Sequence, residues 1–164
     1  MVVLDSVGPL TTEPAKLPAQ MREALAELES LKARQRNYYR DFDTAVRARA
    51  DKGVSLEAAR ALGERGIVCD EKGCYWNLDP RLRVLNPLSL SEEQVKAFMT
   101  QIECPLLAVL APGFWQAKPH RQQMLRERVA YLKDVTVHQL DGGHHQHMEA
   151  NAPQIAALIR QFLA

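Results

Sequence analysis

The segment GGHHQHME at residues 142–149 constrains the fold more than any other stretch of the sequence. An extended apolar run at 135–140 precedes it, and a stretch with apolar residues at helical spacing follows it. Two glycines between a strand and a helix allow a sharp turn with positive φ. This order predicts that His144 lies at the carboxyl end of a strand, where α/β sheets carry their chemistry. Because histidine is the usual general base near neutral pH, His144 is a candidate base.

Two further apolar runs predict strands, at residues 1–4 and 106–111, and each stops at a turn. Strands that alternate with helices toward the end of the chain favour a parallel sheet and an α/β fold. A capping box at Ser91 and Gln94 marks the start of one helix, and Asn151 is expected to cap the last one. The remaining helices are predicted at about residues 19–36, 42–51, 55–66 and 120–133.

The composition excludes several classes of partner. With 21 basic and 20 acidic residues, the formal net charge of +1 gives no electrostatic reason to expect binding to nucleic acid or to an anionic membrane. No apolar run approaches the ~20 residues of a membrane span, and the N-terminus lacks the pattern of a signal peptide. Three cysteines, an odd number, favour a reduced protein in the cytoplasm. Two of them, Cys69 and Cys74, lie in a predicted hairpin that turns at Gly73.

Three stretches, at residues 2–10, 104–109 and 142–149, carry a resemblance to a known family. In them the chain resembles the C-terminal part of an α/β-hydrolase-fold enzyme of the serine-hydrolase-like branch. The resemblance implies that residues 1–10 and 104–164 form part of the hydrolase core, with the sixth, seventh and eighth strands of its sheet side by side. It also implies that residues 11–103 form a mostly helical cap.

This resemblance implies a serine hydrolase that acts on a carboxylic ester or a similar small acyl substrate and needs no cofactor. His144 would be the general base, and Asp5, at the end of the first strand, would hold the imidazole. A purely structural alternative for Asp5, that its carboxylate accepts hydrogen bonds from turn amides, stays open. Aromatic residues in the cap and in the turn after the second core strand could line an acyl pocket or belong to the core: Tyr38, Tyr39, Trp76 and Trp115.

The nucleophile of the family is missing from the sequence. Family members carry it on a G-x-S-x-G elbow before the sixth strand, and the 164 residues contain no such motif. Ser6 does not replace it, because Leu4 stands where the first glycine belongs and Pro9 follows closely. A serine and an aspartate nucleophile both remain open. A metal site at His144, His145 and His147 is disfavoured, because zinc sites need ligands from other segments as well.

The missing elbow leads to two expectations about the isolated chain. It should lack nucleophilic catalysis, and its first strand should offer an open apolar edge. Through that edge the chain is expected to associate with itself or with a separate N-terminal half. The alternative function is a non-catalytic fragment or partner-binding module that retains the hydrolase edge and the cap. An upstream reading frame that encodes G-x-S-x-G would favour the enzyme.

Overall fold

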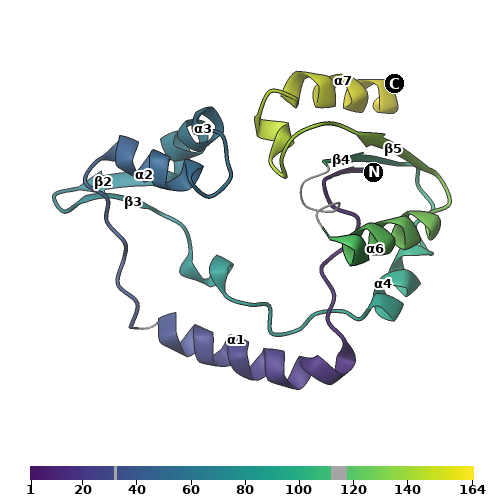
Figure 1. The fold of residues 1–164 in the computed structure, drawn as a ribbon, viewed down its shortest axis with the longest axis horizontal. Helices are drawn as coiled ribbons and strands as arrows, with labels where there is room; N and C mark the ends of the chain where they lie inside the picture. Colours follow the sequence, from purple (N-terminus) through teal and green to yellow (C-terminus); the bar gives the residue numbers. More distant parts are fainter. Residues whose placement is uncertain (32, 112–117) are drawn as a thin grey trace. The chain divides into compact units, whose positions relative to one another are not determined.

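The structure is a computed structural model, and it describes residues 1–31, 33–111 and 118–164. The chain forms two compact units. The first, here called the sheet unit, consists of residues 1–13 and 90–164, and the second, the insertion unit, consists of residues 14–89. Figure 1 follows the chain from the N-terminal strand through the insertion unit and back into the sheet unit.

The sheet unit is built on three parallel strands, β1 (Val2–Leu4), β4 (Leu106–Leu110) and β5 (Val135–Gln139). They lie in the order β1-β4-β5, with Leu4 opposite Val109 and Leu110 opposite Gln139. This arrangement confirms the predicted α/β class and the three neighbouring strands. All three carboxyl ends therefore meet at one edge of the sheet.

Helices cover both faces of this sheet. Figure 1 shows α7 (Ala152–Leu163) on one side of the strands, and α4 (Glu92–Met99) and α6 (Pro119–Ala130) on the other. Alternate residues of β4 point to opposite faces, as they must in a strand. Leu106, Ala108 and Leu110 belong to the core cluster under α4 and α6, whereas Leu107 and Val109 pack with the helix α7. All five residues are buried, which explains the uninterrupted apolar run.

The predicted capping box begins α4. The Gln94 amide donates to Ser91 Oγ at 3.3 Å, and the Ser91 amide donates to Gln94 Oε1 at 2.9 Å. The apolar face of this helix, with Val95 and Met99, is buried in the core of the sheet unit. Residues 90–103, which we expected in the cap, therefore lie in the sheet unit.

The predicted cap of the last helix is wrong. Asn151 precedes α7, but its side chain makes no capping hydrogen bond. It donates instead to the carbonyl oxygen of Asp141. Gly142, with φ +144°, brings the chain so close that a Cβ there would lie 3.1 Å from Asn151 Nδ2. Asn151 thus stabilises the turn that carries His144, at residues 141–151, rather than the first turn of α7.

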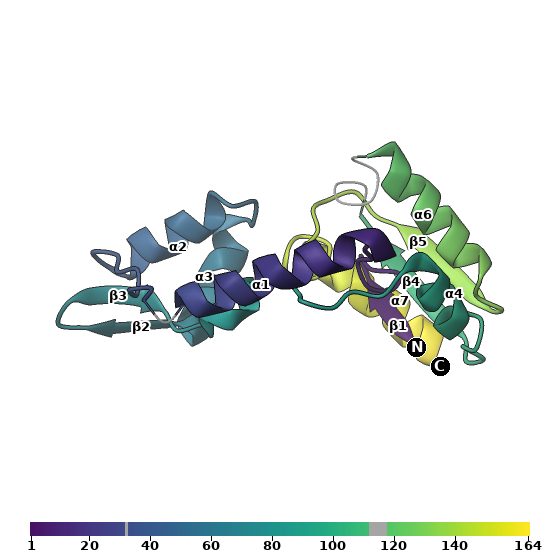
Figure 2. The ribbon, with the colours of Figure 1, turned by 90° about the horizontal axis from the view of Figure 1, so that it is seen from below.

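The insertion unit is mostly helical, with α1 (Leu17–Leu31), α2 (Phe42–Ala50) and α3 (Leu56–Gly66). Short 3₁₀ helices lie at Pro14–Lys16 (η1) and Pro80–Arg83 (η2). A hairpin of β2 (Ile67–Asp70) and β3 (Gly73–Trp76) lies beside α2 and α3 (Figure 2). The helix α1 ends at Leu31, the last of its apolar residues at helical spacing, whereas the sequence predicted an end at about residue 36.

The hairpin carries a disulfide that overturns the expectation of reduced cysteines. Cys69 and Cys74 face each other in the antiparallel register, with their Cα atoms 4.0 Å apart, and their sulfurs are bonded. Cys104 is an exposed free thiol. Because disulfides are rare in reducing compartments, the cysteine content no longer supports a cytoplasmic location. Among the described residues, no helix combines the length and apolar character that a membrane span requires.

Candidate active site

Asp5 lies directly after β1 in a conformation that few side chains adopt. Its φ is +48°, in the left-handed region, and it is only 1% exposed. Its amide continues the ladder by donating to the Val109 carbonyl at 2.7 Å, and its Oδ1 accepts the Ala111 amide at 2.9 Å. Backbone strain of this kind persists only where the surroundings hold it, and it is common at functional sites. The end of the neighbouring strand β4 thus fixes the orientation of the carboxylate.

The other carboxylate oxygen of Asp5 meets His144. His144 Nδ1 lies 2.6 Å from Asp5 Oδ2, across 139 residues of sequence. About half of the His144 side chain remains exposed, whereas the Asp5 side chain is 1% exposed. The structure therefore joins the two predicted residues as a buried carboxylate that holds an accessible imidazole. With its second oxygen, Asp5 also accepts the Ala111 amide, so the carboxylate has a structural contact as well.

The turn that carries His144 is tied to the sheet at both ends. The Leu140 amide extends the ladder by donating to the Leu110 carbonyl at 3.0 Å, and Gly142 supplies the positive φ that the glycine pair predicted. Beyond the turn, the fully buried Gln146 donates from Nε2 to the Val109 carbonyl at 3.4 Å. Sequence reasoning did not identify Gln146, because a glutamine among histidines carries no signal of burial.

A buried arginine holds the loop after β1, and sequence reasoning missed it as well. Arg128, on α6, is fully buried. Its Nη1 donates to the Val7 carbonyl at 2.7 Å, and its Nε and Nη2 donate to the two carboxylate oxygens of Glu92 at 3.2 and 2.8 Å. Thr11 also donates to Glu92. These bonds connect the segment just beyond Asp5 to α4 and α6.

The Glu92 carboxylate is held in its charged form. Burial by itself would raise the pKa of Glu92. The hydrogen bonds from Arg128 and Thr11, together with the positive charge of Arg128, outweigh this effect, so the pKa lies below its ordinary value of 4.5. The ion pair is therefore complete at neutral pH.

The other polar residues near the strand ends have different environments. Ser6 is exposed, and its hydroxyl donates to the Gly8 carbonyl at 3.3 Å. The ring of His145 packs edge-on between those of His144 and His147, with centroids 5.1 and 6.2 Å away. Within residues 1–31, 33–111 and 118–164, no group of three histidine, cysteine or acidic side chains is arranged to hold a metal ion.

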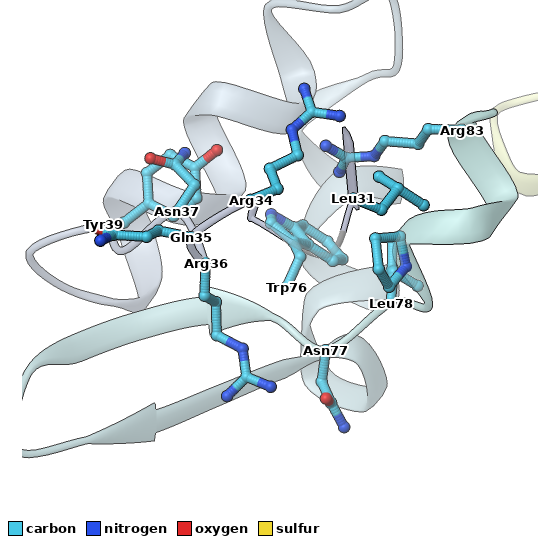
Figure 3. A pocket seen from close by; sticks show the side chains of 11 residues that line it. Leu31, Arg34, Gln35, Arg36, Asn37, Tyr39, Trp76, Asn77, Leu78 and Arg83 are labelled. Carbon is cyan, nitrogen blue, oxygen red and sulfur yellow. The ribbon is translucent and has the colours of Figure 1, made fainter. Parts of the chain in front are cut away.

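The predicted aromatic residues separate into three groups. Tyr39 and Trp76 line a cavity of about 440 Å³ in the insertion unit (Figure 3) and a second of about 500 Å³. Tyr38 instead packs edge-on against Tyr75, 5.3 Å between centroids, and donates from its hydroxyl to Asp70. Trp115 lies outside the described residues.

Comparison with known proteins gives structural relatives only. No protein-family model matches the sequence, and no curated protein matches it. The crystal structure of the hypothetical protein PA1622 from Pseudomonas aeruginosa PAO1 is 31% identical, with a TM-score of 0.87, over 99% of this chain and 57% of that one. The chain therefore spans little more than half the length of this relative.

Two solved structures with enzymatic names share the fold at lower identity. The thioesterase domain from the curacin biosynthetic pathway is 21% identical, with a TM-score of 0.73, over 96% of this chain and 56% of that one. For E-2-(acetamidomethylene)succinate hydrolase the values are 13% and 0.64, over 99% and 57%. Together with the parallel sheet and its flanking helices, these likenesses show that the chain has part of an α/β-hydrolase fold.

Proposed function

We propose that this chain supplies the acid and the base of a serine hydrolase that cleaves a carboxylic ester or a similar acyl bond. The observation that carries the proposal is the 2.6 Å contact between His144 Nδ1 and Asp5 Oδ2. A carboxylate at Nδ1 selects the tautomer in which Nε2 accepts a proton. His144 then takes the proton of the attacking serine at Nε2 and returns it to the leaving group. Asp5 stabilises the imidazolium that forms between these steps.

The nucleophile comes from residues beyond these 164, because the sequence contains no G-x-S-x-G elbow. The coverage of about 57% of the solved relatives supports this part of the proposal. In the family that the sequence resembles, the nucleophile strand pairs along β1, which is the outer strand of the three described here. We propose that this edge takes the missing segment, from the same polypeptide or another, and that in its absence a second copy pairs there.

The substrate-binding part of the proposal rests on aromatic side chains. Tyr39 and Trp76 line cavities in the insertion unit, which supports a role in holding the acyl group. Tyr38 and Trp115 are proposed to contribute as predicted from the sequence. The insertion unit, residues 14–89, would thus serve as the cap.

The isolated chain is expected to be inactive. Without a nucleophile it should hydrolyse p-nitrophenyl acetate and p-nitrophenyl butyrate no faster than free imidazole at the same concentration, and Ser6→Ala should change nothing. The measurement is the initial rate over a range of substrate concentrations. When the chain is joined to a segment that carries a G-x-S-x-G elbow of this fold, the rate should become saturable. Saturable hydrolysis by the isolated chain that disappears in Ser6→Ala would contradict the proposal.

A further inference from the structure

The cavity of about 440 Å³ in the insertion unit has a strongly basic wall. Arg34, Arg36 and Arg83 line it, and no acidic residue is among its described lining residues. The neighbouring cavity shares Arg83 and adds three more cations, against the single carboxylate of Asp79. Asp79 is already bound by both Nε and Nη2 of Arg81. The described lining of the two cavities therefore carries more positive than negative charge.

Two of the three guanidinium groups have no partner in the described part of the chain. Arg36 lies over the ring of Tyr75, with Cζ 4.0 Å from the centroid, so its charge is partly satisfied. For Arg34 and Arg83, no hydrogen bond or ion pair of the side chain exists among the described residues. In Figure 3 these two side chains point toward one another beside Trp76, whereas Arg36 points away. Two like charges that face one another are best satisfied by an anion between them.

The segments that carry the two arginines are held together by other residues. Arg34 follows α1, and Arg83 ends η2. Glu27 on α1 accepts the Leu85 amide at 3.0 Å, and Gln20 donates to the Asn86 carbonyl at 2.6 Å. The backbone segments that carry the pair are thus positioned without a ligand, which lowers the cost of binding one.

The Trp76 ring gives the cavity a rigid apolar wall. Its Nε1 donates to the Ala45 carbonyl at 3.1 Å, and a Cβ at Gly66 would lie 3.1 Å from the ring, so the backbone packs closely under it. Leu31 and Leu78 extend this wall. An apolar surface next to a pair of guanidinium groups fits a ligand that has both an anionic group and an apolar skeleton.

From these observations we infer that the insertion unit binds an organic anion, with its oxyanion between Arg34 and Arg83 and its carbon skeleton against Trp76. If the proposed function holds, this anion is part of the acyl substrate. The binding itself does not depend on turnover, so its failure and the failure of the proposed function can be told apart.

Phenyl phosphate, phenol and inorganic phosphate separate the two parts of the site. Isothermal titration calorimetry of the unmodified chain should show phenyl phosphate binding more tightly than either fragment. Arg34→Gln and Arg83→Gln should each weaken phenyl phosphate binding by about 10- to 100-fold, as expected for charged hydrogen bonds. Both arginines are exposed, so neither change should affect folding.

Arg81→Gln is the matched control, since Arg81 lies on the same 3₁₀ helix, is exposed and is already paired with Asp79. It should leave the affinity for phenyl phosphate within about twofold. If Arg81→Gln and Arg83→Gln lower the affinity for phenyl phosphate equally, the effect comes from net charge alone. That result would overturn the inference. Equal binding of phenol and phenyl phosphate, or no binding of phenyl phosphate at millimolar concentration, would overturn it as well.

Discussion

Replacing His144 with alanine is expected to lower kcat by about four orders of magnitude or more in the hydrolase completed by its nucleophile segment. The reason is that no group remains to take the proton of the serine in the first half of the reaction and the proton of the attacking water in the second. kcat/KM should fall by the same factor, because the lost interaction acts in the transition state rather than in substrate binding. Steady-state kinetics with p-nitrophenyl butyrate provide the measurement.

Asp5→Asn should produce a loss of about 10⁴-fold by a different route. An asparagine oxygen can still accept the Ala111 amide at the position that Oδ1 occupies now. Its NH₂ group would then face His144 Nδ1, so the imidazole would carry its proton on Nε2 and could no longer act as a base. His145→Ala and His147→Ala are the controls and should cost far less. Equal losses at all three histidines would contradict the assignment of His144 as the single base.

Arg128→Met is expected to destabilise the sheet unit by about 3 kcal/mol. Methionine keeps the apolar stem of the side chain but leaves the buried Val7 carbonyl without a donor, and it leaves Glu92 without its bidentate partner. The cost lies at the lower end of the range for buried ion pairs because the Glu92 side chain is 46% exposed and therefore partly screened. Urea denaturation at pH 7 is the measurement.

Arg126→Met is the matched control for Arg128→Met. Arg126 lies on the same helix, but it is exposed, so the change should stay within about 0.5 kcal/mol. Because the pKa of Glu92 is lowered in the folded state, its contribution to stability is complete above pH 4.5 and is lost as the pH falls through the folded value. Arg128→Met should weaken this acid dependence, whereas Arg126→Met should keep it. The same acid dependence in both variants would show that the ion pair contributes nothing.

The sequence was informative where chemistry follows from chain order. Three apolar runs predicted three parallel strands, and residues just after parallel strands share one edge of the sheet. That reasoning singled out His144, and the resemblance to the α/β-hydrolase fold added Asp5 as its expected partner. The Ser91 capping box could be predicted for the same reason, since its partners are three residues apart.

Features that depend on distant pairs could not be predicted. Arg128 and Glu92 are 36 residues apart, and nothing in either local pattern marks the arginine as buried. Arg34 and Arg83 converge only because of how the insertion unit folds. Asn151 satisfied the local rule for a helix cap, but its side-chain NH₂ group donates to the Asp141 carbonyl and its side chain makes no capping bond to the helix. The disulfide fits the hairpin that the sequence predicted around Gly73, in which Cys69 and Cys74 face each other. We did not predict it because the odd number of cysteines favoured a reduced protein.

The central claim is that Asp5 orients His144 so that Nε2 can accept a proton, and the tautomer of the imidazole tests it most directly. A long-range ¹H–¹⁵N NMR spectrum of the chain, with His144 assigned by comparison with His144→Gln, distinguishes the two ring nitrogens at a pH where the imidazole is neutral. Our account predicts that Nδ1 carries the proton, and that Asp5→Asn moves it to Nε2. A proton on Nε2 in the unmodified chain, or the same spectrum in both proteins, would contradict it.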